Sequence, residues 1–254
     1  MIDIHCHILP GIDDGPKDIH ESIIMAKAAV SDGITQVMGT PHFTRKYENT
    51  KEIIVEKVKQ VNEALVVENI PLKILPGQEP RIYGEILEDY QNGKILTLND
   101  SGKYLFIELP SNHVPRYTER LLYDFQMKEI TPIIVHPERN QEMIENPDIL
   151  YNLVEKGALT QVTASSVVGD LGKKIRTFSL QLLENNLTHF IASDAHNIST
   201  RSFRLGQAYE ELDKEFGVQA VYMLKENAEL LVLGETVFRD SPSRMKQKKF
   251  LGLF

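Results

Sequence analysis

The sequence predicts an α/β protein built on parallel strands. Short β-rich runs alternate with helical patterns along the chain, and this alternation requires right-handed crossovers between parallel strands. The chain has 254 residues, of which 42% are hydrophobic and 25% charged. That length and composition suffice for one large core and are typical of single-domain α/β barrels. The pattern alone fits either a closed barrel or an open doubly wound sheet.

Seven runs are the strand candidates. They occupy residues 2–7, 34–40, 72–78, 104–109, 131–136, 159–163 and 189–193. Between them lie helix candidates such as 18–32 and 51–68, in which apolar residues recur at helical spacing. Gly33 follows the first of these helices, as expected at a helix C-terminus. No Gly/Ser/Pro-rich linker or internal repeat interrupts the pattern, so we expect one domain over 1–243, followed by a basic and apolar tail over 244–254.

Composition excludes several classes of protein. The formal net charge of -8 argues against nucleic-acid binding, which normally requires a basic face. A single cysteine excludes an intramolecular disulfide, and the first residues lack the features of a secretory signal. The scattered glycines form no Rossmann or P-loop motif. We therefore expect a cytoplasmic protein that does not bind nucleic acid.

Most of the predicted strands end in a residue that can bind a metal. The ends carry His5, His7, His42, Glu79, Glu108, His136, Asp194 and His196. In parallel α/β folds the C-terminal ends of the strands share one face, which is where barrel active sites lie. Within "HCH" and "DAH", the spacing of two residues directs both ligands to the same side of an extended chain. We therefore expect these side chains to meet at one mouth.

Cys6 is expected to be a buried, inert thiol because it points away from its two histidine neighbours. The phosphate loop of cysteine-dependent phosphatases has an arginine six residues after the cysteine, and Ile12 stands there instead. Cys6 is therefore not expected to be a nucleophile.

Other polar residues near these motifs receive structural roles or none. His20, His113 and His189 are expected to be structural, since they lie on a helix face, in a loop and at a strand start. The role of Asp3 stays open. Spacing also does not choose between Asp13 and Asp14 as a ligand.

The ligand types indicate the chemistry. Imidazole and carboxylate without thiolate suit Zn²⁺, Mn²⁺ or Fe²⁺. About nine candidate ligands exceed the needs of one ion, whereas two or three ions roughly 3.5 to 4 Å apart would use them all and would activate water for hydrolysis of a phosphate ester or an amide. Arg139, in "HPERN", and Arg201, in "DAHNISTR", are expected at the same mouth. Guanidinium groups match phosphate oxygens, so this pair favours phosphoryl chemistry.

The motifs "DIHCHILPGIDDG", "TPHF", "GQE", "FIEL", "IVHPERN" and "IASDAHN" resemble those of the polymerase and histidinol phosphatase (PHP) superfamily. More closely, the chain is similar to the manganese-dependent protein-tyrosine phosphatases that are encoded with bacterial capsule and exopolysaccharide kinases. The resemblance runs from Met1 to about Leu233. It implies a distorted TIM-like (βα)7 barrel with the active site at the C-terminal ends of the strands.

The resemblance also implies three divalent ions, Mn²⁺ first, with Fe²⁺ or Zn²⁺ as alternatives. By that resemblance, one ion is bound by His5, His7, Glu79 and Asp194, a second by Glu79, Glu108 and His136, and a third by Asp14, His42 and His196. The family pattern thus selects Asp14. The candidate catalytic residues are Arg139, Arg201 and His42.

The resemblance predicts hydrolysis of phosphotyrosine on the tail of a membrane-associated bacterial tyrosine kinase, and thereby regulation of capsule or exopolysaccharide synthesis. Two alternatives stay open: a histidinol-phosphate phosphatase of the same superfamily, and a non-catalytic module that binds phosphorylated tails. The tail 244–254 has four basic residues and an apolar end. It is expected to be mobile or to make a weak contact with a membrane surface.

Overall fold

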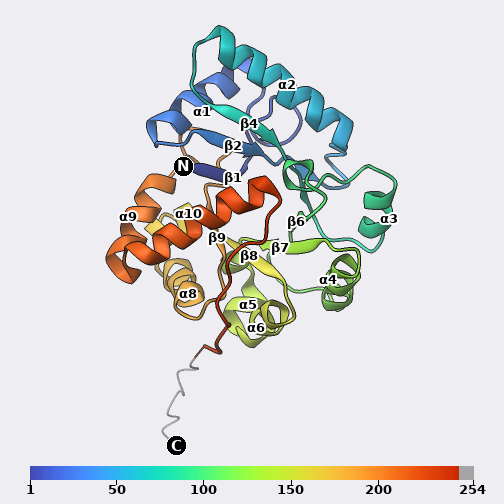
Figure 1. Ribbon diagram of the computed structural model, residues 1–254, viewed down its shortest axis with the longest axis vertical. Helices are drawn as coiled ribbons and strands as arrows, with labels where there is room; N and C mark the ends of the chain where they lie inside the picture. The colour runs from blue at the N-terminus through green and yellow to red at the C-terminus, as the bar shows by residue number, and fades with distance from the viewer. Residues whose placement is uncertain (246–254) are drawn as a thin grey trace, which may run out of the picture.

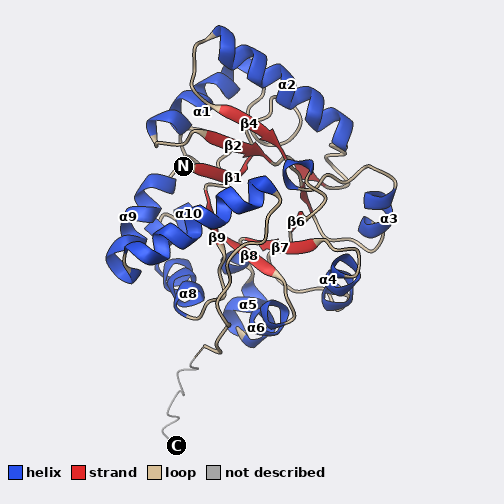
Figure 2. Ribbon diagram, viewed as in Figure 1, coloured by secondary structure: helices blue, strands red, loops and turns tan. Residues whose placement is uncertain are grey.

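The computed structural model describes residues 1–245, and every ladder between its strands is parallel. Figure 2 shows the strands gathered in the middle of the molecule, with the helices around them. The strands are β1 (Ile2–Cys6), β2 (Gln36–Gly39), β3 (His42–Phe43), β4 (Lys73–Pro76), β5 (Glu79–Pro80), β6 (Tyr104–Ile107), β7 (Thr131–Val135), β8 (Leu159–Thr163) and β9 (Phe190–Ala192). The predicted parallel α/β class is confirmed.

The strands form three sheets, in the orders β1-β2-β4, β3-β5 and β6-β7-β8-β9. Two isolated parallel bridges connect their margins. Cys6 pairs with Ala195, just after β9, and Arg81, just after β5, pairs with Glu108, just after β6. The described strands do not form one closed sheet, so closure into a barrel stays a prediction.

Helices enclose these sheets, and α10 packs against β1 and β9 (Figure 1). The helices are α1 (Ile19–Ser31), α2 (Lys51–Val67), α3 (Ile86–Gln91), α4 (Thr118–Gln126), α5 (Gln141–Glu145), α6 (Asp148–Glu155), α7 (Ala164–Val168), α8 (Lys173–Glu184), α9 (Leu205–Phe216) and α10 (Val218–Leu233), with 3₁₀ turns η1 (Leu98–Asp100) and η2 (Pro137–Arg139). Asp18 caps α1 by accepting a hydrogen bond from the Glu21 amide at 3.0 Å. Gly234 ends α10 in a left-handed conformation.

Two groups of buried apolar side chains hold the strands in place. One lies between strands and helices and includes Val37, Leu105 and the helical residues Ile54 and Leu212. The other joins neighbouring strands to α10 and includes Ile4, Met38, Phe106, Phe190 and Leu231. The rigid packing on both sides of the strands fixes the positions of the side chains at their ends.

All seven predicted strands are present, and β3 and β5 are additional. Each additional strand has two residues, too few for a repeating pattern in the sequence. They nevertheless matter, because they begin with His42 and Glu79 and pair these two residues in register.

The first two residues of the predicted tail contact the folded domain. The Arg244 guanidinium forms an ion pair with Asp148 at 2.9 Å and lies over the Tyr151 ring, while Met245 packs against the core. The rest of that tail, 246–254, lies outside the described residues. Among residues 1–245, no helix has the length and apolar character needed to cross a bilayer.

Candidate metal centre

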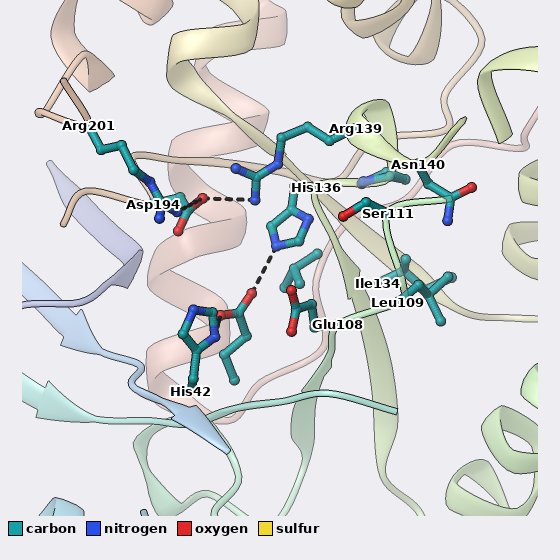
Figure 3. Close-up of a pocket in the computed structure, with 13 residues that line it drawn as sticks. His42, Glu108, Leu109, Ser111, Ile134, His136, Arg139, Asn140, Asp194 and Arg201 are labelled. Atoms are coloured by element: carbon teal, nitrogen blue, oxygen red, sulfur yellow. Dashed lines mark hydrogen bonds and ion pairs between the residues drawn. The ribbon is translucent and has the colours of Figure 1, made fainter. Parts of the chain in front are cut away.

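The candidate ligands meet at the C-terminal ends of the strands. His5 lies near the end of β1 and His7 just after it, Glu108 follows β6, His136 follows β7, and Asp194 and His196 follow β9. Beside them lies a cavity of about 270 Å³ (Figure 3). Its lining includes His42, Glu79, Glu108, His136, Arg139, Asp194 and Arg201. The convergence expected from the sequence is therefore observed.

Three overlapping groups of side chains have the geometry to hold metal ions, with ligand atoms within 4.8 Å of one another. They are His5, His7 and Glu79; His42, Glu79 and Glu108; and His7, Asp14, His42 and His196. The second aspartate of "DDG" therefore joins the cluster. His136 belongs to none of the three groups but contacts Glu79, and Asp194 lies near His5 and His7.

Glu79 is the centre of this arrangement. Its Oε1 lies 2.8 Å from His136 Nε2 and 3.4 Å from His5 Nε2. Its Oε2 lies 2.7 Å from His42 Nδ1 and 3.3 Å from His7 Nε2. A carboxylate placed between four imidazoles suits the bridging position between ions.

Several of the polar atoms that face one another here lack hydrogen-bond partners. Within residues 1–245, the unpartnered buried atoms of the cluster are His5 Nε2, His7 Nε2, His42 Nδ1, His196 Nε2, Glu79 Oε2 and Glu108 Oε2. Buried polar atoms are normally paired, because each unpaired one costs about 1 to 3 kcal/mol. Imidazole and carboxylate donors without thiolate fit Mn²⁺, Fe²⁺ or Zn²⁺, and a bound ion would satisfy these atoms.

Burial and neighbouring charges set the protonation of the cluster. Burial opposes charge on Glu79 and Asp194, yet His5 and His42 hold the pKa of Glu79 well below its usual range, and Arg139 and His5 do so for Asp194. Burial and Arg139 lower the pKa of His136 to about 4. The result is ionised carboxylates beside a neutral imidazole, which are the protonation states that metal ligands need.

The remaining members show the same competition. Burial and His7 lower the pKa of His196 to about 4. Burial also opposes the charge of His42, but Glu79 and Asp14 raise its pKa to about 10. Burial and the neighbouring Glu79 raise the pKa of Glu108 to about 7. The raised pKa values of His42 and Glu108 both reflect in part the negative charge of Glu79, and a cation beside that carboxylate would be favoured.

Two arginines extend over the same mouth. Arg139 Nη2 lies 2.9 Å and Arg201 Nη2 3.1 Å from the same oxygen of Asp194, Oδ2, so both guanidinium groups converge on this carboxylate (Figure 3). Arg201 Nη1 also lies 3.5 Å from Asp14. Both arginines line the cavity, and an anion entering it would meet them beside the ligand cluster.

The Arg139 loop is fixed by its two neighbours. The buried Glu138 accepts hydrogen bonds from the Thr163 amide at 3.0 Å and the Ser166 hydroxyl at 2.7 Å, at the end of β8. Asn140 donates to the carbonyl oxygens of Pro110 and His113. Sequence reasoning did not assign these roles, although both polar residues directly flank Arg139 in "HPERN".

Two further residues contact candidate ligand histidines on the ring nitrogen that points away from Glu79. Asp13 Oδ2 lies 2.7 Å from His7 Nδ1, and Gln161 Oε1 lies 2.8 Å from His5 Nδ1. Gly15 keeps Asp13 close, because a Cβ at that position would lie 2.3 Å from the His7 carbonyl oxygen. Sequence reasoning missed Gln161; its signal was a polar side chain inside the otherwise apolar and β-branched run "LTQVT".

The residues set aside by the sequence have structural surroundings. Cys6 is fully buried, as predicted, and burial raises the pKa of its thiol well above the ordinary value. Asp3 accepts hydrogen bonds from the Ser193 amide and hydroxyl and so fastens β1 to the end of β9. His189 is buried, and its Nδ1 accepts a hydrogen bond from the Thr160 amide. His20 and His113 are exposed and belong to none of the three ligand groups.

Comparison with known proteins adds to this geometry. The family model for capsular polysaccharide synthesis, CpsB/CapC, matches residues 1–233. The chain is 52% identical to the tyrosine-protein phosphatase YwqE of Bacillus subtilis and 41% identical to the putative tyrosine-protein phosphatase CapC of Staphylococcus aureus, each over the full length of both proteins.

A crystal structure gives the same relationship. YwqE from Bacillus subtilis and CpsB from Streptococcus pneumoniae have been solved together as unique metal-dependent tyrosine phosphatases. The matching chain from these structures superimposes on this one with a TM-score of 0.95 at 52% identity. The match covers 97% of this chain and 100% of that one. This chain therefore belongs to the CpsB/CapC family of capsular polysaccharide synthesis proteins.

Proposed function

We propose that this protein is a metal-dependent protein-tyrosine phosphatase that hydrolyses phosphotyrosine on a bacterial tyrosine kinase and so regulates capsule or exopolysaccharide synthesis. The observation that carries the proposal is the ring of unpartnered imidazole and carboxylate atoms at one end of the strands, with Arg139 and Arg201 beside it. The identity to YwqE over the whole chain supports the substrate class. We also propose the tail of a membrane-associated kinase as the partner and the cytoplasm as the location.

Three divalent ions are proposed, with Mn²⁺ as the first choice. His5, His7, Glu79 and Asp194 would hold one, Glu79, Glu108 and His136 a second, and Asp14, His42 and His196 a third. The central position of Glu79 supports its assignment to two ions. When bound, such ions supply an activated water and neutralise the charge of the phosphoryl group.

The arginines are proposed to bind and orient the substrate. Arg139 and Arg201 share Asp194 Oδ2, and the phosphoryl oxygens would provide a second anion for the same guanidinium forks. As the bond between phosphorus and the tyrosine oxygen breaks, the charge on the phosphoryl oxygens changes. Hydrogen-bond donors that are held in place beside these oxygens therefore stabilise the transition state. Glu138 and Asn140 hold Arg139 in position for this task.

His42 is proposed as a ligand, and its role as a catalytic residue stays a prediction. Its Nδ1 lies 2.7 Å from Glu79 and its Nε2 lies 3.4 Å from Asp14, so both ring nitrogens face carboxylates of the cluster. The tyrosinate leaving group needs only modest help with protonation, because a phenol has a pKa of about 10.

The fold proposed for this function is a distorted (βα)7 barrel. The bridges from Cys6 to Ala195 and from Arg81 to Glu108 support it, because they connect the margins of the separate sheets. We assign residues 1–243 to one domain and 244–254 to a tail that makes weak contact with the membrane surface.

One experiment tests the function. Turnover of a phosphotyrosine peptide from the kinase tail and of histidinol phosphate would be measured side by side, with added Mn²⁺ and after chelation. We expect faster hydrolysis of the peptide and loss of activity on chelation. Preference for histidinol phosphate would overturn the substrate assignment, and turnover that survives chelation would overturn the metal centre.

A further inference from the structure

Gln161 is a buried polar residue that the proposed mechanism does not use. It lies in the middle of β8, whose five residues are all buried, and its own side chain is fully excluded from solvent. Its Oε1 lies 2.8 Å from His5 Nδ1. Its Nε2 has no hydrogen-bond partner among residues 1–245. An unpaired amide in a strand interior destabilises the folded protein, because the buried donor has lost its hydrogen bonds to water.

The contact determines which nitrogen of His5 can bind a metal. An amide oxygen only accepts hydrogen bonds, so His5 Nδ1 must carry the proton. In a neutral imidazole the other nitrogen, Nε2, then presents a free lone pair. That atom lies 3.4 Å from Glu79 Oε1 and 3.5 Å from Asp194 Oδ1, in the centre of the ligand cluster. With the amide reversed, a proton on Nε2 would prevent metal binding.

The same arrangement occurs at two other histidines of the cluster. His7 Nδ1 faces the carboxylate of Asp13 at 2.7 Å, and His196 Nδ1 lies 2.9 Å from the backbone carbonyl oxygen of Asp194. Each of the three rings therefore has an oxygen on Nδ1 and an unpartnered Nε2. A consistent pattern over three rings is a property of the site rather than an accident of packing at one of them.

Gln161 also explains the part that β8 plays. None of the nine candidate ligands comes from β8 or from the residues directly after it, although the strand lies between β7 and β9, which both lead to ligands. Through Gln161 the strand reaches across the interior to a ligand of β1. We propose that Gln161 is a positioning residue that fixes the tautomer and the ring orientation of His5 for metal binding. The inference rests on the metal centre of the proposed function and not on its substrate.

The test measures binding of Mn²⁺ alone, by competition with a chelator of known affinity. Gln161→Leu keeps the approximate volume and removes the acceptor, and we expect its Kd for Mn²⁺ to rise by about 10- to 100-fold. Gln161→Glu keeps an acceptor on Nδ1, as Asp13 does at His7, and should restore the Kd to within about threefold of the parent protein. The melting temperature of the metal-free Gln161→Leu protein should change little, because the substitution removes the unpaired Nε2 but also leaves the buried His5 Nδ1 without its acceptor.

Asn227→Leu is the matched control. Asn227 is a fully buried amide of α10 that donates hydrogen bonds to the carbonyl oxygens of His189 and Phe238. His189 directly precedes β9, whereas the candidate ligands Asp194 and His196 follow it, so Asn227 bonds at the opposite end of this strand. Its loss should lower the melting temperature and leave the Kd for Mn²⁺ unchanged.

Unchanged Mn²⁺ affinity in Gln161→Leu would overturn the inference, as would an equal loss of affinity in Asn227→Leu, because the effect would then be one of general stability. Failure of the parent protein to bind Mn²⁺ would overturn the proposed centre itself. A parent protein that binds Mn²⁺ but does not hydrolyse phosphotyrosine would contradict only the proposed substrate. The effect of Gln161→Leu on Mn²⁺ binding would still decide the inference.

Discussion

The two ends of the strands both bury polar side chains, but they satisfy them in opposite ways. At the N-terminal end, Asn227 donates hydrogen bonds to the carbonyl oxygens of His189 and Phe238 and accepts one from the Phe238 amide. At the C-terminal end, Nε2 of His5 and Nε2 of His7 are buried, face carboxylates and have no hydrogen-bond partner. The first arrangement is complete without a ligand, whereas the second leaves donor atoms that a metal ion could satisfy.

Two buried histidines show the difference at the level of single atoms. His189 Nδ1 accepts a hydrogen bond from the Thr160 amide, and burial and the charge of Arg239 lower its pKa to about 3. His5 Nδ1 instead faces an amide oxygen, which leaves its Nε2 directed at Glu79 and Asp194. Burial alone therefore does not identify a functional histidine; the direction of its unpartnered nitrogen does.

At the C-terminal end of the strands, Asp194→Asn should cause a large loss of activity. Asp194 contacts His5, His7, Arg139 and Arg201, and the substitution removes its charge while keeping its shape. Loss of a residue that only positions a metal ligand costs about 10- to 100-fold in activity. Loss of a ligand itself should cost more, about 10³-fold in kcat/KM for a phosphotyrosine peptide. Steady-state kinetics with saturating Mn²⁺ would measure this, and activity within tenfold of the parent would contradict the ligand assignment.

A smaller effect is expected for Arg139→Lys. The substitution keeps the charge and removes the planar fork, and a single donor to the transition state is worth about 10²- to 10³-fold. We expect kcat to fall by about 10²-fold while the affinity for Mn²⁺ stays within a few-fold of the parent. Arg120→Lys is the matched control, because Arg120 pairs with Asp124 on the exposed face of α4. An equal effect of both substitutions would argue against a role for Arg139 in the site.

The general position of the site could be predicted from the sequence because two physical rules suffice for it. Parallel strands place their C-terminal ends on one face, and His5, Glu108, His136 and Asp194 lie at or next to such ends. Successive side chains of a strand also point to opposite sides, so His5 and Cys6 face in different directions. The same rules predicted that Cys6 would be buried.

Other features required contacts over long sequence separations. Gln161 and His5 are 156 residues apart, and Glu138 reaches Ser166 across the end of β8. Asp13 and Asp14 are adjacent and chemically identical, so only the turn through Gly15, which directs one to His7 and the other to His42 and His196, separates their roles. Such pairings arise from the three-dimensional packing and leave no periodic signal in the sequence.

At the N-terminal end, Asn227→Leu should affect stability and not activity. The substitution leaves the Phe238 amide and two carbonyl oxygens without their partner, and each unpaired buried group costs about 1 to 3 kcal/mol. We expect the free energy of unfolding to fall by about 3 kcal/mol, measured by urea denaturation of the metal-free protein. Turnover of the phosphotyrosine peptide at 25 °C should be unchanged, and a loss of kcat in the folded variant would remove the distinction between the two ends.

His189 should make the stability of the protein depend on pH. Because the folded-state pKa of His189 is about 3 and an unfolded histidine has a pKa of about 6.5, the unfolded chain binds a proton that the folded chain does not between these values. Stability from the neutral ring is therefore complete above pH 6.5 and is lost as the pH falls toward 3.

In His189→Asn an amide oxygen can accept from the Thr160 amide and does not titrate. Between pH 7 and pH 5 the parent protein should lose about 2 kcal/mol more stability than this variant, measured by urea denaturation of the metal-free proteins. Parallel pH profiles would show that His189 titrates alike in the folded and the unfolded protein, and the contrast between this structural histidine and the candidate ligand histidines would then lose its basis.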